Sequence, residues 1–330
     1  MQAVSDGIDL DRVVADVLNG KEIDRAIARA IIEWPDDRLN DLLHATRRVR
    51  EVAFGRRVKL CMLRNAQSGV CPEDCHYCSQ SKISKADIPV YRMQSVDNLV
   101  AGARQAVASG ALRYCMVCSM RGPADRDIDH LATACAKIRE EFPDLELCLS
   151  LGLMSRAHAE RLKQAGAGWI NHNLNTSREF YPRICTTHTY DDRLETIENI
   201  RAAGLMTCAG GIIGMGETDE DILNLAYETR RLKLDSVPLN FLHPIAGTPL
   251  EERRELTPEK CLKVACLFRL LNPTSEVRAA GGRELNLGDR QADLFNAVNS
   301  VFVNGYLTTP GLDYIRTREM IERAGFEVEG

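Results

Sequence analysis

From about residue 57 onward, short runs of β-forming residues alternate with stretches that have the apolar periodicity of amphipathic helices. Short apolar runs bounded by turn signals are typical of strands buried inside a sheet. The pattern predicts strands at Arg57–Leu63, Leu112–Cys118, Leu145–Leu151, Gly168–Leu174, Leu205–Ile213, Ser236–Leu242, Ser275–Ala279 and Ser300–Val303.

The intervening stretches carry the signals that begin helices. Thr189 is followed three residues later by Asp192, and Thr218 is followed in the same way by Asp221. This is the spacing of a reciprocal N-terminal cap. Pro258 stands at a first helical position, where its missing N–H costs nothing. These signals predict helices between the strands.

Roughly eight strands that alternate with helices imply a parallel sheet. The number favours a closed (β/α)8 barrel of the TIM type, and a doubly wound open sheet is the alternative. Residues 1–55 lack strand patterning and are predicted to form two or three helices, an N-terminal helical extension. Residues 56–310 form the predicted barrel, and residues 311–330 a short C-terminal closing helix.

Composition narrows the class of protein. The chain has 330 residues, a formal charge of −5 and a pI near 5.9, which argues against a general binder of nucleic acid or membrane surfaces. No run approaches the roughly 18–20 apolar residues that span a bilayer. Met1–Asp11 carries acidic residues and no apolar core of a signal peptide, so we expect a cytoplasmic protein. In that compartment twelve cysteines are expected to be metal ligands or buried residues.

The strongest motif is C-x3-C-x2-C after the first predicted strand, formed by Cys71, Cys75 and Cys78. Three thiolates at this spacing can hold three irons of a [4Fe–4S] cube and leave one iron open. An open iron can bind the methionine end of S-adenosylmethionine (SAM). Structural zinc is the alternative, but it usually takes two C-x2-C pairs, and no fourth cysteine follows closely. Tyr77 suits a contact to a bound adenine or, equally, packing within the loop.

A second group of candidate ligands is spread over four predicted strands. Cys115, Cys148 and Cys208 lie in three of them, and Arg278 lies in a fourth. Because side chains alternate along strands, these four can point together into a barrel. A buried arginine needs a partner, since an unpaired buried charge is costly. A second metal site and ordinary buried cysteines remain equally good interpretations of the spacing.

Amides mark a candidate binding face. Asn171, Asn173 and Asn175 repeat with period two and are expected to line one face of the fourth strand, and Asn240 is a lone amide at another strand end. Such amides are poor core residues and good partners for ribose, carboxylate or ureido groups. The glycine run that starts at Gly210 allows the backbone to approach a flat ligand.

Together these motifs resemble the biotin synthase family of the radical SAM superfamily. The resemblance covers about Val58 to Tyr306. It is carried by CPEDCHYCSQ from Cys71, NHNLNT from Asn171, GIIGMGE from Gly211, by Asn240, and by Val277–Arg278.

The resemblance implies two metal centres. The first is the [4Fe–4S] cluster on Cys71, Cys75 and Cys78, whose open iron takes SAM. The second is an auxiliary [2Fe–2S] cluster with three cysteine ligands and one arginine. The residues that match this second ligand set are Cys115, Cys148, Cys208 and Arg278.

The resemblance also implies contacts to small molecules. Asn173 and Asn175 look like contacts to SAM and substrate, Arg193 to the SAM carboxylate, and Asn240 to the ureido ring of the substrate. Tyr77 is grouped with the SAM contacts. Some family members carry aspartate where this chain has Asn175; an amide can still bond hydroxyls, but it is a weaker acceptor.

The implied activity is a sulfurtransferase-type conversion of dethiobiotin to biotin. A 5′-deoxyadenosyl radical made from SAM abstracts substrate hydrogens, and the auxiliary cluster donates sulfur. The implied partners are dethiobiotin, SAM and an electron donor such as flavodoxin or ferredoxin, and a homodimer is expected from the resemblance alone. The alternatives are another radical SAM enzyme that forms a different C–S or C–C bond, and a zinc-binding or iron-storing barrel without catalysis.

The remaining cysteines have no role in these predictions. Cys118 lies three residues after Cys115, so the two face opposite sides of an ideal strand, and Cys118 is expected to be a packing residue. A bulge or a strand end between them would bring Cys118 near the auxiliary cluster. Buried packing is the expectation for the other cysteines, which are Cys61, Cys135, Cys185, Cys261 and Cys266.

Overall fold

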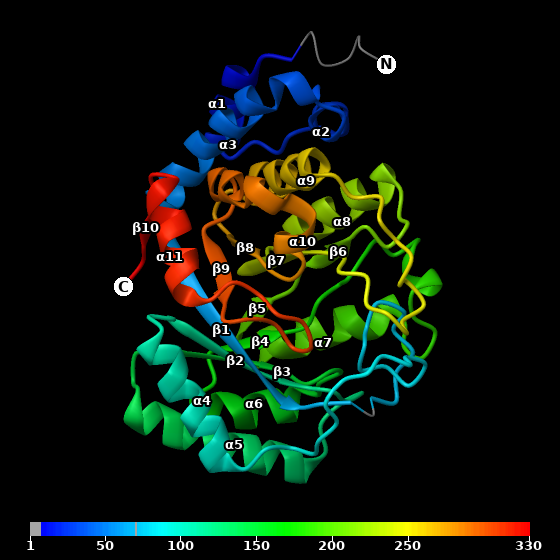
Figure 1. The fold of residues 1–330 in the computed structure, drawn as a ribbon, viewed down its shortest axis with the longest axis vertical. Coiled ribbons are helices and arrows are strands. Elements are labelled where there is room, and N and C mark those ends of the chain that lie inside the picture. Colours follow the sequence, from blue (N-terminus) through cyan, green and yellow to red (C-terminus); the bar gives the residue numbers. More distant parts are fainter. Residues whose placement is uncertain (1–7, 70) are drawn as a thin grey trace.

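The computed structural model describes residues 8–69 and 71–330 of the chain. Its centre is a parallel sheet in the order β1-β2-β3-β4-β5-β7-β8-β9, with β6 beside β7. Strand β1 also pairs with β9, so the sheet closes into the predicted 8-strand barrel with helices around it (Figure 1). The eight strands of this order are β1 (Arg57–Gln67), β2 (Arg113–Cys118), β3 (Glu146–Ser150), β4 (Trp169–Asn171), β5 (Met206–Cys208), β7 (Ser236–Phe241), β8 (Glu276–Ala279) and β9 (Ser300–Val303), and the additional short strand is β6 (Gly211–Ile213).

Helices between consecutive strands cover the outside of the barrel. The reciprocal caps predicted at Thr189 and Thr218 are present, each with the aspartate three residues later, and Thr257 caps the helix that starts at Pro258. Each cap satisfies backbone N–H groups that the first helical turn leaves unpaired. The helices are α4 (Val96–Ala108), α5 (Asp125–Glu141), α6 (Arg156–Gln164), α7 (Tyr190–Ala202), α8 (Asp219–Arg231), α9 (Pro258–Leu271) and α10 (Arg283–Leu287), with the 3₁₀ segments η3 (Tyr181–Arg183) and η4 (Gly288–Asn296).

Within the described residues, three α-helices precede the barrel and pack on its outer helices α8 and α9 (Figure 1). They are α1 (Leu10–Leu18), α2 (Arg25–Ile32) and α3 (Leu39–Phe54), with the 3₁₀ turn η2 (Asp36–Arg38). The hydroxyl of Tyr227 on α8 donates a 2.7 Å hydrogen bond to the carbonyl of Ile23, which ties the extension to the barrel. Residues 1–7 of the predicted extension lie outside the described residues.

The chain ends beside its first strand. Helix α11 (Tyr314–Arg323) falls in the segment predicted to close the chain, and the two-residue strand β10 (Glu327–Val328), which the sequence pattern does not predict, pairs in parallel with β1. The division into residues 1–55, 56–310 and 311–330 stays a prediction. Within the described residues, no helix is long and apolar enough to cross a membrane.

Three predicted strands differ clearly from the observed ones. Strand β1 runs to Gln67, four residues beyond the predicted end. The run Leu205–Ile213 is split into β5 and β6, because the chain turns at Ala209 and Gly210 to pass Pro238. Strand β4 stops at Asn171, three residues before the predicted end. All three differences lie at the carboxyl ends of strands, where a barrel of this type builds its binding loops.

Candidate active site and metal-binding cysteines

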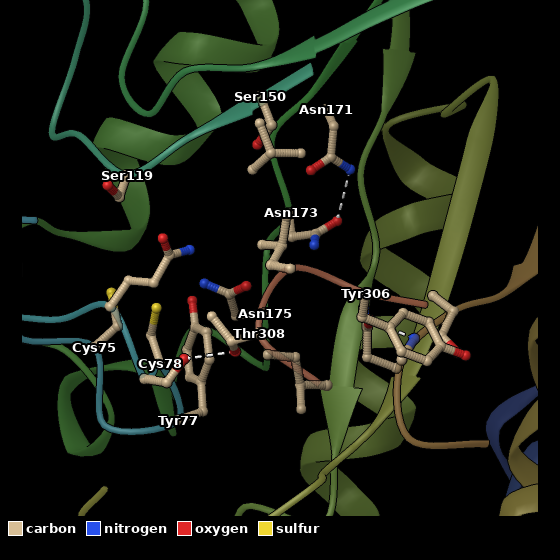
Figure 2. A pocket seen from close by; sticks show the side chains of 18 of the residues that line it. Cys75, Tyr77, Cys78, Ser119, Ser150, Asn171, Asn173, Asn175, Tyr306 and Thr308 are labelled. Atoms are coloured by element: carbon tan, nitrogen blue, oxygen red, sulfur yellow. Dashed lines mark hydrogen bonds between the residues drawn. The ribbon is translucent and has the colours of Figure 1, made fainter. Parts of the chain in front are cut away.

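A cavity of about 370 Å³ opens at the carboxyl ends of the barrel strands. Figure 2 shows Cys75, Cys78 and Tyr77 on one side of it, with Asn171 and Asn173 across from them. Most of the predicted site residues line this cavity. They are Cys71, Cys75, Tyr77, Cys78, Cys115, Asn171, Asn173, Asn175, Arg193, Asn240 and Arg278.

The cysteine motif forms a tight loop after β1. The N–H of Cys71 donates to the carbonyl of Gln80 at 3.1 Å, and the N–H of Cys78 donates to the carbonyl of Cys75 at 3.1 Å. Burial raises the pKa of Cys71, and it raises the pKa of Cys78 to about 11. The thiols of this loop therefore gain from a bound metal, which would stabilise their thiolate forms.

The second predicted group lies deeper in the barrel. Cys115 and Cys148 are register partners on β2 and β3, and Cys148 and Cys208 are buried and pack with Cys115 in one cluster. Nη1 of Arg278 donates to Sγ of Cys208 at 3.5 Å. The neighbouring thiols of Cys115 and Cys208 raise the pKa of Cys148, so the three sulfurs are close enough to interact.

The sulfur of Cys208 is poised to be anionic. The Cys148 thiol donates a hydrogen bond to it, and the guanidinium groups of Arg278 and Arg113 add positive charge; against the effect of burial, these lower the pKa of Cys208 to about 5. Three converging thiols beside a buried arginine are a donor set that fits an iron–sulfur cluster.

Charged residues that were not predicted from the sequence lie next to this group. Glu276, two residues before Arg278 on β8, forms an ion pair with it and accepts from Nη1 and Nη2 of Arg113 at 2.9 and 3.0 Å. Glu146 accepts from Nε of Arg113 at 2.7 Å. The period-two spacing of Glu276 and Arg278 was the available signal, because it places both side chains inside the barrel.

The predicted reason for grouping the asparagines was wrong, although all three line the cavity. Only Asn171 belongs to β4; Asn173 and Asn175 lie in the loop after it. Nδ2 of Asn171 donates to Oδ1 of Asn173 at 3.2 Å, and Asn175 has a φ of 72° (Figure 2). Asparagine adopts this left-handed conformation more readily than most residues, so the loop, not a strand face, orients these amides.

Asn175 offers an unpaired group to the cavity. Its side chain is buried, and its Nδ2 has no hydrogen-bond partner in the part of the chain that the structure describes. Its backbone is fixed, because the carbonyl accepts from the N–H of Ile212 at 2.8 Å. A buried unpaired donor that faces a cavity fits a bound ligand, since leaving it unsatisfied is costly.

Two further predicted contacts are held in place by their neighbours. Asn240 on β7 donates to the carbonyl of Gly211 at 3.1 Å and accepts from the N–H of Gly281 at 3.0 Å. Arg193 on α7 donates to the carbonyl of Asn173 at 2.7 Å. Both side chains line the cavity, so their orientation there is set before any ligand binds.

Cys118 is the last residue of β2, where the register against β1 shifts between Asn65 and Gln67. This irregularity lets Cys118 line the same cavity as Cys115. Its sulfur lies 3.7 Å from Sδ of Met93, and burial raises the pKa of Cys118 to about 12.

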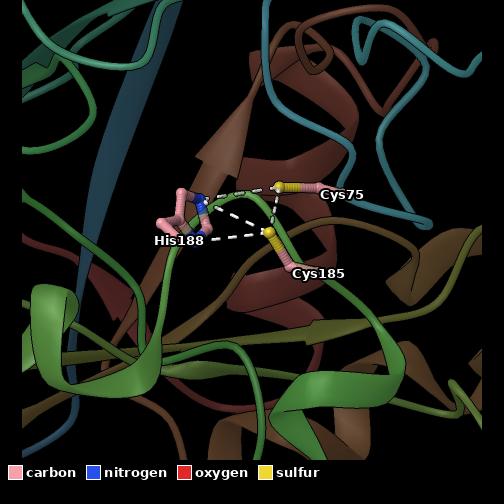
Figure 3. Close-up of side chains that lie close together, drawn as sticks. All are labelled: Cys75, Cys185 and His188. Atoms are coloured by element: carbon pink, nitrogen blue, oxygen red, sulfur yellow. Dashed lines mark hydrogen bonds between the residues drawn. The ribbon is translucent and has the colours of Figure 1, made fainter.

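One cysteine without a predicted role lies at the site. Sγ of Cys185, in the segment between η3 and α7, is 3.8 Å from Sγ of Cys75, and His188 lies beside both sulfurs (Figure 3). The other four cysteines without a predicted role are buried and are not among the residues that line this cavity. Sequence spacing carries no signal for Cys185, because it is separated from Cys75 by 110 residues.

Comparison with known proteins places these features in a family. The Radical SAM superfamily matches residues 67–226, and the Biotin and Thiamin Synthesis associated domain matches residues 238–327. Biotin synthase of Anoxybacillus flavithermus is 47% identical over 313 residues, which cover 95% of both chains. The chain belongs to the biotin synthase family. Biotin synthase of Bacillus cytotoxicus is 44% identical over 329 residues, covering 100% of this chain and 99% of the relative.

Solved structures confirm the fold. Methylornithine synthase has a TM-score of 0.84 at 20% identity, with 96% of this chain and 97% of the other covered. The FeFe-hydrogenase maturase HydG from Carboxydothermus hydrogenoformans has a TM-score of 0.81 at 18% identity, with 97% of this chain and 79% of the other covered. At such low identities, these structures support only the fold. Membership of the biotin synthase family rests on the relatives found by sequence.

Proposed function

We propose that this chain converts dethiobiotin to biotin by radical SAM sulfur insertion, with two iron–sulfur clusters as cofactors. Membership of the biotin synthase family supports the reaction. The observation that carries the residue assignment is the pairing of two thiol groups along one cavity. The motif with Cys71, Cys75 and Cys78 lines the cavity. The second group, called the floor group below, consists of Cys115, Cys148, Cys208 and Arg278; Cys115 and Arg278 line the same cavity, and Cys148 and Cys208 are buried beside Cys115.

Each group would hold one cluster. Cys71, Cys75 and Cys78 would bind the [4Fe–4S] cluster and leave one iron for SAM, and the floor group would bind the [2Fe–2S] cluster. When bound, the clusters and SAM supply the radical chemistry and the sulfur, so the protein needs no acid–base residue of its own.

Four side chains are proposed to hold SAM. Tyr77 lies in the cysteine loop and suits the adenine, and the unpaired amide of Asn175 suits a ribose hydroxyl. Arg193 is assigned to the SAM carboxylate, because it is buried and the carbonyl of Asn173 that it meets is a neutral acceptor. Asn173 is assigned to SAM and substrate together.

Asn173 and Asn240 are proposed to orient dethiobiotin between the two metal groups. Asn240 uses one N–H and its oxygen on backbone partners, so its remaining N–H can meet a ureido oxygen. The barrel walls then exclude water from the substrate, which protects reactive intermediates from side reactions.

The proposal also covers the electron donor, the oligomeric state and the location of the protein. We infer a flavodoxin or ferredoxin as electron donor, a homodimer and a cytoplasmic location, with no role for nucleic acid or membrane. The electron donor and the homodimer rest on the family resemblance alone. The net charge of −5 supports the exclusion of nucleic acid.

The number of iron–sulfur clusters that the chain binds distinguishes this proposed function from that of a radical SAM enzyme with one cluster. We expect Cys148→Ala, reconstituted without oxygen, to lose the [2Fe–2S] absorption and its share of iron and sulfide, while the [4Fe–4S] signals remain. Cys266→Ala is the matched control, because Cys266 is a buried cysteine of α9 outside the cavity. Equal iron, sulfide and absorption in Cys148→Ala and Cys266→Ala would reject the assignment of the floor group.

A further inference from the structure

Two thiols from distant parts of the chain face each other beside the cysteine loop. Sγ of Cys75, which belongs to the motif proposed to hold the [4Fe–4S] cluster, lies 3.8 Å from Sγ of Cys185 (Figure 3). Cys185 has no part in either proposed cluster. A disulfide bond is about 2.05 Å long, so the two sulfurs have to approach each other by less than about 2 Å to be joined.

Hydrogen bonds hold the two cysteine-bearing segments against each other. The N–H of His76 donates to the carbonyl of Ile184 at 2.9 Å, so the residues next to the two cysteines are bonded through their backbones. Oδ1 of Asp74 accepts from the N–H groups of Thr186 and Thr187 at 2.9 and 3.2 Å. The two backbones are therefore fixed side by side around the sulfur pair, and a disulfide requires such closely placed backbones.

The two sulfurs differ in their access to the cavity. Cys75 is one of the residues that line it, whereas Cys185 is buried and is not among the described residues of the lining. Sγ of Cys185 donates to Oδ1 of Asp74 at 3.2 Å, and Nδ1 of His188 lies 3.3 Å from the same sulfur. A small oxidant that enters the cavity therefore meets Cys75 first, and Cys185 is held in place to react with the oxidised sulfur.

We propose that a small hydroperoxide, such as hydrogen peroxide, joins Cys75 and Cys185 of the cluster-free chain in a disulfide. The Cys75 thiol attacks one peroxide oxygen and the O–O bond breaks, which gives the sulfenic acid of Cys75 and one water. Sγ of Cys185 then attacks the sulfenic sulfur, and the S–O bond breaks. The hydroxyl leaves with the thiol proton as a second water. Two thiols are thus oxidised by two electrons, and one peroxide is reduced to two waters.

The disulfide would act as a reversible cap on the cysteine motif. It keeps Cys75 from the sulfinic acid stage, which thiol reductants do not reverse. It also withholds one of the three thiolates that the [4Fe–4S] cluster needs, so cluster assembly has to wait for a thiol reductant. Only this effect on cluster assembly rests on the proposed function, because the disulfide itself forms in a chain without clusters.

The test treats the full-length, reduced, cluster-free chain with hydrogen peroxide and digests it with trypsin in the absence of a reductant. Trypsin cleaves after lysine and arginine, so Cys75 falls in peptide 65–82 and Cys185 in peptide 184–193. We expect these two peptides as a linked pair, with a mass lower than their sum by two hydrogen atoms, and we expect dithiothreitol to separate them. Cys185→Ser should lose the linked pair, because its hydroxyl can still donate to Asp74 but cannot form the bond.

Cys71→Ser and Cys78→Ser are the matched controls, because each changes a cysteine of the same peptide and leaves Cys75 in place. Both should keep the linked pair, and Cys75→Ser should lose it. A linked pair that survives in Cys75→Ser would assign the bond to another cysteine and overturn the proposal. A disulfide within peptide 65–82, with peptide 184–193 unlinked, would overturn it as well.

Failure of this proposal is distinguishable from failure of the proposed function. A wild-type chain that assembles both clusters under reducing conditions but forms no linked pair with peroxide would reject the disulfide alone. A chain that forms the linked pair but takes up no cluster under reducing conditions would reject the proposed function and leave the disulfide standing.

Discussion

Arg278 is a fully buried cation whose charge is balanced within the barrel. Glu276 pairs with it and with Arg113, and the hydroxyl of Ser300 accepts from its Nε at 3.2 Å. Burial alone would raise the pKa of Glu276, but the guanidinium groups of Arg278 and Arg113 lower it. The carboxylate thus stays ionised and holds Arg278 against the thiols.

Glu276→Gln should therefore be costly. Removing one partner of a buried ion pair typically costs about 3–5 kcal/mol, because the remaining charges are left uncompensated. Glu141→Gln is the matched control, since its pair with Arg104 lies on the surface, where such pairs contribute about 0.2–1 kcal/mol. The measurement is urea unfolding of the cluster-free chains; equal losses in the two variants would contradict this view of the barrel interior.

The ion pair between Glu276 and Arg278 also predicts how the stability of the fold depends on acid pH. A carboxyl whose pKa is lowered on folding stabilises the protein above its unfolded pKa of about 4.3, and this contribution is lost as the pH falls. Stability of the wild-type chain should thus drop below about pH 4 more steeply than that of Glu276→Gln. Parallel acid-unfolding curves for the two chains, recorded by circular dichroism, would count against the assignment.

Strand periodicity predicted the location of the second candidate group, but its interpretation as a metal site came from the family resemblance. Cys115, Cys148 and Arg278 could be placed in the barrel because strand periodicity fixes which face they occupy. Cys185 and His188 could not be placed, because their position depends on how the segment between η3 and α7 folds back on the cysteine loop.

At the scale of elements, strands and caps were predictable and strand ends were not. The predicted strands overlap those of the barrel because each is a short buried run. The end of β4 and the break between β5 and β6 were missed, because they depend on packing between neighbouring strands. Gly210 shows this: its N–H donates to Oδ1 of Asn173 at 3.1 Å, and a side chain there would collide with the carbonyl of Pro238.

Gly210→Ala should accordingly force β6 and β7 apart. Overpacking of this kind typically costs about 1–3 kcal/mol of stability. The movement of the backbone should also weaken SAM binding, because it displaces the N–H of Gly210 that holds the side chain of Asn173. Gly168→Ala is the control, because the nearest atom to its added Cβ is Leu147 O at 3.9 Å. Urea unfolding and SAM titration of both variants test this, and a Gly210→Ala chain as stable as Gly168→Ala would refute the packing argument.

At the scale of the whole molecule, the barrel brings distant segments to one cavity. The cysteine loop follows β1, the asparagine loop follows β4, and Arg278 lies on β8. Closure of β1 against β9 rules out the open doubly wound sheet that the strand count alone had allowed. Family membership was accessible from motifs, whereas the mutual placement of the two thiol groups needed the closed barrel.

The central claim is that both thiol groups act on one substrate within this cavity. The most direct measurement is anaerobic incubation of the reconstituted chain with SAM, dethiobiotin and a reductant, with biotin and 5′-deoxyadenosine quantified together. We expect both products from the wild-type and Cys266→Ala chains, and 5′-deoxyadenosine without biotin from Cys148→Ala. If the wild-type chain forms 5′-deoxyadenosine and no biotin, the radical SAM class stands and the assignment to biotin formation is wrong.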